Sequence, residues 1–390
     1  MAPQPPVPGR QVADMDMKTG LDREAIRVGE PLPWDLVNAE GRILFRKGFI
    51  VHSETNRQRL LAMGLRPRED DGLEPATPDP APPPMGSGPF RQIEYWADRT
   101  QDCFDHLSRN PRSRPGEIRE IVSALQALYR EHEDACLAAI HFNHHRPYSC
   151  LHPVYSLFLA ELFATATGYP GDTGTALAGA ALTANLGMYE YHDEWATQAG
   201  PLDEAQQRVR LAHPDESVRR LRAAGITDPL WLRTVRQHHE HPDGSGYPQG
   251  LKGGEILREA LVLAVIDRYL AFVMPRQGRR PLYPTAALKK LYEDAAKYDM
   301  DIVANFIKLL GIYPPGTLVR LVNGELAVVI RRRANDALHP EVVSLGYLDG
   351  DWWEEPRPRD TREPPYRIKG AHPMEETQGL TPARVARAWL

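Results

Sequence analysis

The chain has 390 residues, of which 42% are hydrophobic and 25% are charged, so it is long enough for two or three folded units and too apolar for wholesale disorder. Its formal net charge of −5 argues against a protein that binds duplex nucleic acid through overall positive charge. The most apolar segment, residues 257–274, is interrupted by four charged side chains, and we therefore expect no membrane span.

Cysteine usage and the N-terminal residues indicate a compartment. The chain contains three cysteines, Cys103, Cys136 and Cys150, and no two of them form a Cys-x-x-Cys pair. This pattern is not typical of a disulfide-stabilised protein. The first residues also lack the basic start and apolar core of a secretory signal. These features predict a protein of the reducing cytoplasm.

The first part of the chain contains one short ordered region between proline-rich segments. Residues 1–22 are expected to form a flexible tail, because apolar periodicity is absent. Alternating segments at 26–28 and 42–45, followed by a short helical pattern, predict a small α+β module over residues 23–66. Residues 67–89 hold eight prolines and are predicted to form an extended linker.

Residues 90–312 show apolar side chains at helical spacing almost throughout, which predicts a helical domain. The pattern is clear at Ile118, Ile121, Val122, Leu125 and Leu128. Segments 154–162, 261–269 and 302–310 repeat the same spacing. We therefore expect these segments to bury one face each in a common core.

After the helical region the apolar period changes from 3.6 to 2 residues. The dipeptide Asn323-Gly324 lies between two alternating segments and predicts a β-hairpin, with a third strand at 342–345. We therefore expect a C-terminal β-hairpin extension over residues 313–370 and a tail over 371–390.

The segment 238–251 reads His-His-Glu-His-Pro-Asp-Gly-Ser-Gly-Tyr-Pro-Gln-Gly-Leu and carries the strongest chemical signal. A helical pattern from Leu230 leads to His238 and His239, and neutral imidazoles suit zinc, iron, manganese or nickel. The glycines that follow allow backbone N–H groups to approach an anion, and Tyr247 offers a ring and a hydroxyl group. The histidine pair alone is more typical of a solvated helix end, but the complete segment favours a binding site.

The complete segment resembles the signature of the HD-GYP family, bacterial phosphodiesterases that open cyclic di-GMP at a site with two or three metals. The resemblance covers about residues 23–350. It implies a mainly α fold, an HD-type helical bundle with a small N-terminal α+β module and a C-terminal β-hairpin appendix. The matching metal-ligand positions are His152, His213, His238, His239 and Asp267. The loop positions implied in ligand binding are Asp243, Gly244, Gly246, Tyr247 and Pro248.

The His-Asp dipeptide that gives the family its name is missing at the matching position. Ala184 and Asn185 stand in place of the histidine and the aspartate, and Met188 in place of a lysine. A bridging carboxylate offsets the repulsion between two metal ions, and asparagine supplies no negative charge. Alanine removes a ligand, and methionine removes a cation that could neutralise phosphate. We therefore expect no intact catalytic set and no two-metal centre.

The remaining ligands leave two alternatives for the metal. His213, His238 and His239 could hold one divalent transition metal, or the five matching residues could persist as hydrogen-bonded polar groups without any metal. A His192-Asp193 dipeptide lies nearby. Its spacing places it in a connecting loop, and we interpret it as a surface feature.

Three functions are consistent with these features. The favoured one is a degenerate HD-GYP protein of bacterial cyclic di-GMP signalling, which acts as a nucleotide sensor or as an adaptor for a GGDEF-type or other signalling protein. The second is a metal-dependent cyclic di-GMP phosphodiesterase that works with an incomplete metal site. The third is a structural protein that binds neither metal nor nucleotide.

Overall fold

The computed structural model describes most of the chain from residue 88 onward and separate segments before it. The described residues are 15–16, 21–28, 30, 32–34, 36–37, 43–45, 51, 57–58, 60–61, 66–67, 88–110, 116–144, 146–198, 200–276, 280–294, 297–333, 336–377 and 379–389. The chain divides into two compact units, Met1–Ala81 and Pro82–Leu390. Among the described helices, none is both long enough and apolar enough to span a bilayer.

The smaller unit contains short antiparallel strands around a small apolar core. β1 (Met15–Asp16) pairs with β2 (Leu21–Asp22), so part of the expected N-terminal tail is paired. A second sheet has the order β4-β3-β5, with β3 at Leu36–Val37, β4 at Ile43–Phe45 and β5 at Arg66–Pro67. Its core side chains are Ile26, Leu32, Leu36, Val51 and Leu60.

The prediction of a strand at residues 26–28 is wrong. The Asp22 carboxylate accepts hydrogen bonds from the backbone N–H groups of Glu24 and Ala25 and starts a 3₁₀ turn there. The chain leaves this turn through Ile26 and makes only an isolated bridge between Val28 and Val51. The beginning of the short helix predicted after this region lies outside the described residues, as does most of the predicted linker.

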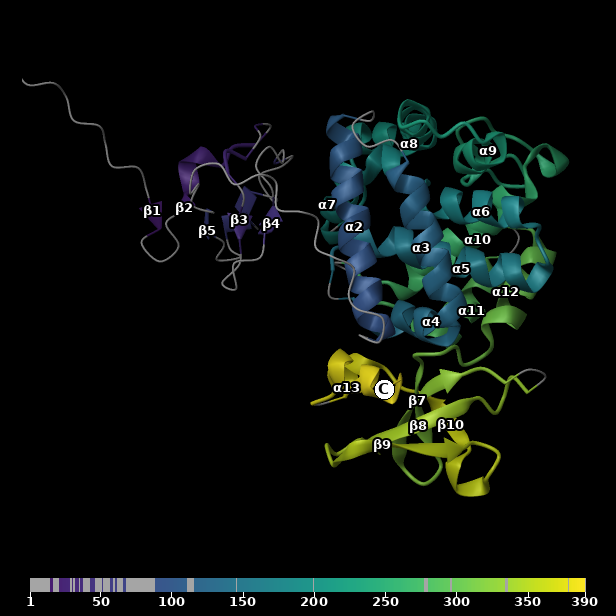
Figure 1. The fold of residues 1–390 in the computed structure, drawn as a ribbon. Coiled ribbons are helices and arrows are strands. Elements are labelled where there is room, and N and C mark those ends of the chain that lie inside the picture. Colours follow the sequence, from purple (N-terminus) through teal and green to yellow (C-terminus); the bar gives the residue numbers. More distant parts are fainter. Residues whose placement is uncertain are drawn as a thin grey trace, which may run out of the picture. The chain divides into compact units, whose positions relative to one another are not determined.

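Helices form most of the larger unit up to residue 310 (Figure 1). They are α2 (Pro89–Arg109), α3 (Glu117–Glu131), α4 (Glu133–Phe142), α5 (Tyr148–Thr167), α6 (Gly171–Thr183), α7 (Tyr189–Thr197), α8 (Glu204–Ala223), α9 (Pro229–Gln237), α10 (Arg258–Val273), α11 (Pro284–Glu293) and α12 (Met300–Leu310). Short 3₁₀ helices, η2 (Leu186–Met188) and η3 (Gly253–Glu255), interrupt the series. The predicted helical pattern is confirmed.

α5 is the central helix of this bundle. Every residue from Tyr148 to Ala164 is buried, because α5 packs against α2, α3, α6 and α10. α6 packs against α9, where the indole N–H of Trp231 donates a hydrogen bond to Thr183 Oγ1 at 2.9 Å. These contacts place α5, α8, α9 and α10, which carry or adjoin the predicted metal ligands, next to one another.

The segment that follows α6 is anchored to α8 through its backbone. The N–H group of Gly187 donates to Ser217 Oγ, and that hydroxyl donates to the carbonyl oxygen of Ala184, both at 2.7 Å. A Cβ atom at Gly187 would lie 2.3 Å from the carbonyl oxygen of His213, so this close approach requires glycine. Residues 184–187 therefore lie directly against the helix that carries His213.

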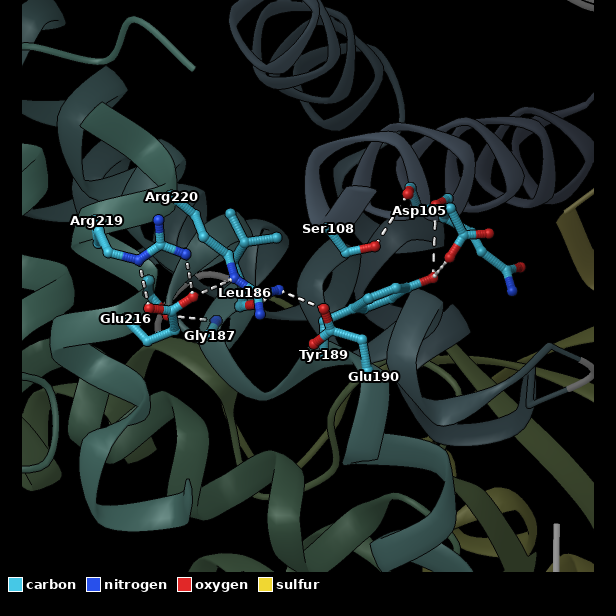
Figure 2. A network of polar contacts seen from close by, with 11 residues as sticks. Asp105, Ser108, Leu186, Gly187, Tyr189, Glu190, Glu216, Arg219 and Arg220 are labelled. Carbon is cyan, nitrogen blue, oxygen red and sulfur yellow. Dashed lines mark hydrogen bonds and ion pairs between the residues drawn. The ribbon is translucent and has the colours of Figure 1, made fainter. Parts of the chain in front are cut away.

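Figure 2 shows how the same segment continues into α7. Arg220 of α8 donates to the carbonyl oxygen of Leu186 at 3.0 Å and pairs with Glu190 at 2.6 Å. At the start of α7, Tyr189 donates from its hydroxyl group to Asp105 of α2 at 2.9 Å. These contacts hold the beginning of α7 between α2 and α8.

The C-terminal part forms a five-stranded antiparallel sheet of order β10-β6-β7-β8-β9. The strands are β6 (Leu318–Leu321), β7 (Glu325–Arg331), β8 (Glu341–Tyr347), β9 (Trp352–Asp360) and β10 (Ile368–Ala371). The predicted hairpin is β6 and β7, joined at Asn323-Gly324, and the predicted third strand is part of β8. The hairpin is therefore one part of a larger sheet, which lies beside α4 (Figure 1).

The expectation of a tail over residues 371–390 is wrong for the residues that the structure describes. α13 (Pro382–Ala386) buries Val385 against the sheet and α4, and the ring of Trp389 contacts Phe90 at 5.5 Å and Phe142 at 5.9 Å between centroids. Apolar burial against a sheet face, which local sequence periodicity does not reveal, orders this segment.

The close approach of Gly187 to α8 can be tested by substitution. Gly187→Ala is expected to lower the free energy of unfolding by about 1–3 kcal/mol, because the new methyl group meets backbone atoms of α8. Gly171→Ala is the matched control, since no described atom lies within 4 Å of a Cβ added at the start of α6. Urea unfolding followed by circular dichroism measures both, and equal stability of the two variants would contradict this packing.

Candidate metal centre

Three histidines from α8 and the end of α9 converge on one point. His213 lies on α8, and His238 and His239 directly follow α9. One ligand atom from each lies within 4.8 Å of the others. The Nε2 atoms of His213 and His238 are 3.4 Å apart, and the ring centroids of His238 and His239 are 4.0 Å apart. The structure thus brings together three of the five predicted metal ligands in one group.

The hydrogen bonds of these rings determine which nitrogen atoms face each other. His213 donates from Nδ1 to the carbonyl oxygen of Arg210, and His238 donates from Nδ1 to the carbonyl oxygen of Val235, each at 2.6 Å. A carbonyl oxygen only accepts hydrogen bonds, so Nδ1 carries the proton in both rings. In the neutral imidazole, Nε2 then carries a lone pair, and two lone pairs face each other.

Burial keeps the three rings neutral. It lowers the pKa of His213 to about 3, with a further contribution from His238, and it lowers the pKa of His238. Burial and the two neighbouring histidines hold the pKa of His239 well below its usual range. Two facing acceptors without a proton between them repel each other, and a cation placed between them relieves this repulsion. The donor set therefore fits a divalent transition metal.

The other two predicted ligands form a second group on α5 and α10. His152 Nε2 lies 3.3 Å from Asp267 Oδ1, and His152 is 2% exposed. Burial alone would raise the pKa of Asp267, but its hydrogen bond and electrostatic interaction with His152 lower that pKa well below its usual value. Asp267 is therefore an anion beside the three-histidine cluster.

The interpretation of His192-Asp193 as a surface feature is wrong. His192 lies in helix α7, is 7% exposed, and places its ring centroid 5.7 Å from that of His152 and 5.2 Å from that of Tyr148. Asp193 accepts hydrogen bonds from the backbone N–H and the hydroxyl group of Ser149, at 2.9 and 2.6 Å. The dipeptide is helical because η2 leads directly into α7, so the chain turns back over the start of α5.

Glu240 orders the loop after the histidine pair. This glutamate is fully buried, and its two carboxylate oxygens accept hydrogen bonds from the backbone N–H groups of Gln249 and Leu251, at 2.6 and 3.0 Å. A Cβ atom at Gly246 would lie 2.4 Å from the backbone nitrogen of His241, so the loop folds back on its own beginning. The glycine-rich segment is therefore a fixed structure.

The predicted ligand-binding residues of this loop lie in different environments. The Tyr247 ring stacks on His239 with centroids 4.7 Å apart, and Pro248 follows through a cis peptide bond. Gly244 has a φ of +82° and packs against Lys252. Asp243 is exposed and accepts a hydrogen bond from Ser245 N–H at 2.8 Å, which stabilises the turn. Only Tyr247 among these side chains contacts the histidines in the described structure.

Two arginines flank the tyrosines nearest the histidines. Arg210 places its guanidinium carbon 5.2 Å from the centroid of Tyr247, and Arg276 lies 4.6 Å from the centroid of Tyr148, whose hydroxyl it also contacts. Guanidinium groups bind phosphate through paired N–H donors. The site therefore combines ligands suited to a metal with cations suited to an anionic substrate or ligand.

Comparison with known proteins agrees with this geometry. Residues 118–302 match the family model described as HD domain. Cyclic di-GMP phosphodiesterase PA4108 of Pseudomonas aeruginosa is 26% identical over 320 residues, which cover 76% of this chain and 77% of that protein. The chain therefore contains an HD domain and is similar to a cyclic di-GMP phosphodiesterase over about three quarters of its length.

Other similar proteins include cyclic di-GMP phosphodiesterase PdeB of Borreliella burgdorferi, 21% identical over 202 residues, which cover 52% of this chain and 52% of that protein. Among solved structures, Bd1817, an HDG"Y"P protein from Bdellovibrio bacteriovorus, is 15% identical with a TM-score of 0.48. That match covers 73% of this chain and 97% of the other.

The segment expected to match the His-Asp dipeptide is buried beside His213. Ala184 is 2% exposed, and Asn185 and Met188 are each 8% exposed. Asn185 Oδ1 is buried and has no hydrogen-bond partner among the described residues. A buried carbonyl oxygen without a hydrogen-bond partner destabilises the fold. Coordination of a cation by this oxygen would satisfy it.

The sequence patterns do not predict four residues that surround this site. Arg210 and Arg276 carry no local signal, because they reach the site only through the packing of α8 and the chain after α10. Glu240 belongs to the His-His-Glu string, but its role depends on two backbone groups farther along the chain. His192 reaches the site because it lies in helix α7, which has only a weak apolar pattern in the sequence.

The neutral histidines predict a pH dependence of the metal-free protein. An unfolded histidine binds a proton below about pH 6.5, whereas His213 in the fold stays neutral down to a pKa of about 3. The unfolded state therefore binds more protons as the pH falls, and the free energy of unfolding should decrease by up to about 1.4 kcal/mol per pH unit for each such histidine. This loss should begin near pH 6.5.

Urea unfolding in the presence of a chelator, at pH 7, 6 and 5, measures this dependence. His213→Gln should reduce the slope by about one proton, since glutamine does not titrate. A free energy of unfolding that stays constant from pH 7 to pH 5 would contradict the assignment of neutral rings.

Proposed function

We propose that this HD-GYP protein binds cyclic di-GMP, or a closely related cyclic dinucleotide, at the three-histidine cluster and its loop, with impaired hydrolysis. The observation that carries this proposal is the facing pair of Nε2 acceptors on His213 and His238 beside the replaced position Ala184. The three histidines expected to hold a metal lie together, whereas Ala184 and Asn185 stand where a catalytic histidine and aspartate are expected.

The binding half is supported by charge and shape. His213, His238 and His239 would hold one divalent transition metal, which supplies a Lewis acid toward a phosphate oxygen when bound. Arg210 and Arg276 provide positive charge near two different tyrosines, and a cyclic dinucleotide carries two phosphates. The two hydrogen bonds to Glu240 hold the loop in place before a ligand binds. The loop therefore loses little conformational entropy on binding.

The impaired half follows from the side chains present. Ala184 has no ligand atom, and Asn185 brings no negative charge to offset the repulsion between two cations. Met188 replaces a cation near the expected phosphate position with an apolar group. A regulatory role, through nucleotide sensing or through a GGDEF-type or other signalling partner, agrees with such a site.

A second candidate function is a metal-dependent cyclic di-GMP phosphodiesterase. The anionic Asp267, paired with the buried His152, favours it, because a hydrolase site needs ligands on both sides. The names of PA4108 and PdeB as cyclic di-GMP phosphodiesterases also support it. The two candidates differ in turnover and agree on nucleotide binding.

Calorimetric titration of the metal-loaded protein with cyclic di-GMP tests the proposal, in parallel with a turnover assay in iron or manganese. The intact chain is expected to bind the nucleotide with no turnover above the metal blank, and His239→Ala should weaken binding at least about tenfold, since it removes a ligand and the ring under Tyr247. His339→Ala, at a histidine paired with Asp336 beside the C-terminal sheet, is the matched control and should bind normally.

Absence of binding to the intact metal-loaded chain would overturn the proposal. Turnover that disappears in His239→Ala and persists in His339→Ala would replace it with the phosphodiesterase function.

A further inference from the structure

His239 is held differently from the other two histidines of the cluster. The rings of His213 and His238 are each fixed by an Nδ1 hydrogen bond to a backbone carbonyl oxygen. The ring nitrogens of His239 make no hydrogen bond to any residue that the structure describes. Its ring is instead stacked on that of Tyr247, with centroids 4.7 Å apart and an interplanar angle of 25°. Ring stacking is therefore the contact that orients His239.

The loop holds Tyr247 over this ring through its backbone. The N–H group of Tyr247 donates a hydrogen bond to the carbonyl oxygen of His239 at 3.1 Å. A Cβ atom at Gly246 would lie 2.5 Å from the same carbonyl oxygen, so this close approach of the loop requires glycine. Glu240 fixes the far end of the loop through its two hydrogen bonds to backbone N–H groups. The stacking of Tyr247 on His239 is therefore part of the folded loop.

Arg210 of α8 connects this stack to His213. Its guanidinium carbon lies 5.2 Å from the centroid of the Tyr247 ring, and its Nη1 atom donates to the Tyr247 hydroxyl group at 3.4 Å. The guanidinium group is itself held by Gln207 Oε1, which accepts a hydrogen bond from Nε at 3.0 Å. The backbone carbonyl oxygen of Arg210 accepts the Nδ1 hydrogen bond of His213 at 2.6 Å. Arg210 thus contacts His213 directly and reaches His239 through Tyr247.

We propose that Tyr247 and Arg210 are positioning residues, which orient His239 toward the other two histidines so that the cluster binds a divalent transition metal. Groups that orient a metal-ligating imidazole are usually hydrogen-bond acceptors on its second nitrogen, and their loss typically weakens metal binding about 10- to 100-fold. Here an aromatic stack takes the place of that acceptor, and the cation over the tyrosine stabilises the stack. The inference rests on the metal-binding role of the cluster in the proposed function.

Orientation of His239 before the metal binds matters because this side chain is only partly buried. His213 and His238 are fully buried and cannot turn away from the cluster without disturbing the core. A His239 ring without an anchor would turn toward solvent part of the time, and metal binding would then have to order it. Tyr247 removes this freedom beforehand, which strengthens the binding of the ion.

The test is a cobalt(II) titration of the full chain after chelator treatment, without nucleotide, followed by the d–d absorption of the bound ion. Tyr247→Leu keeps an apolar side chain but removes the aromatic stack, and it should weaken cobalt binding about tenfold. Tyr247→Phe keeps the ring and should restore most of this affinity. Arg210→Met keeps the aliphatic stem and the carbonyl oxygen that accepts from His213, and it should weaken cobalt binding about threefold.

A double-mutant cycle tests whether Tyr247 acts through His239. His239→Ala lowers the affinity for cobalt by itself, and the addition of Tyr247→Leu should lower it no further, because the ring that Tyr247 orients is gone. A general destabilisation of the loop would instead weaken binding by the same factor in both backgrounds. Tyr366→Leu is the matched control, since Arg359 lies 4.9 Å from the centroid of this ring beside the C-terminal sheet, and it should leave cobalt binding unchanged.

Three results would each overturn the inference: Tyr247→Leu binds cobalt as tightly as the wild type, Tyr247→Phe loses as much affinity as Tyr247→Leu, or the loss is undiminished in the His239→Ala background. Circular dichroism verifies the fold of each variant. Absence of cobalt binding by the wild type would overturn the metal-binding role of the cluster and this inference with it. A wild type that binds cobalt but no cyclic di-GMP would overturn the proposed nucleotide binding alone.

Discussion

The site depends on the close contact between two imidazole acceptor atoms, Nε2 of His213 and Nε2 of His238, which are 3.4 Å apart. Each ring is fixed by an Nδ1 hydrogen bond to a backbone carbonyl within its own helical turn, so neither ring can simply change tautomer to relieve the repulsion. Burial removes the alternative of a stable positive charge on either ring. The helices thus impose a geometry that a cation stabilises.

The packing of the surrounding helices holds these rings in position. Gly187 allows the chain after α6 to lie on the backbone of α8 beside His213, and Ser217 satisfies polar groups on both sides of that contact. The same anchoring directs α7 back over α5, which brings His192 next to His152. A single close contact between two backbones therefore positions residues of both halves of the site.

The charges around the histidine cluster differ from one side of the site to the other. Ala184 and Asn185 bring neither an imidazole nor a negative charge, whereas Asp267 is anionic and the arginines lie close to the tyrosines. The lack of a bridging negative charge weakens the binding of two adjacent cations more than it weakens the binding of one cation with one anionic ligand. The proposed function, binding with impaired hydrolysis, rests on this difference.

The sequence alone determined the helical domain, the hairpin at Asn323-Gly324 and the candidate pair His238 and His239, because periodicity, turn chemistry and a contiguous motif are local properties. His213 joined this site only through the resemblance to a known family. The tertiary structure decided the environment of His192, the role of Glu240 and the packing of α13 against the C-terminal sheet. Each of these depends on contacts between segments distant in the chain, and helix α7 has a weak apolar pattern of its own. Its direction is set by α2, α5 and α8, which no local pattern encodes.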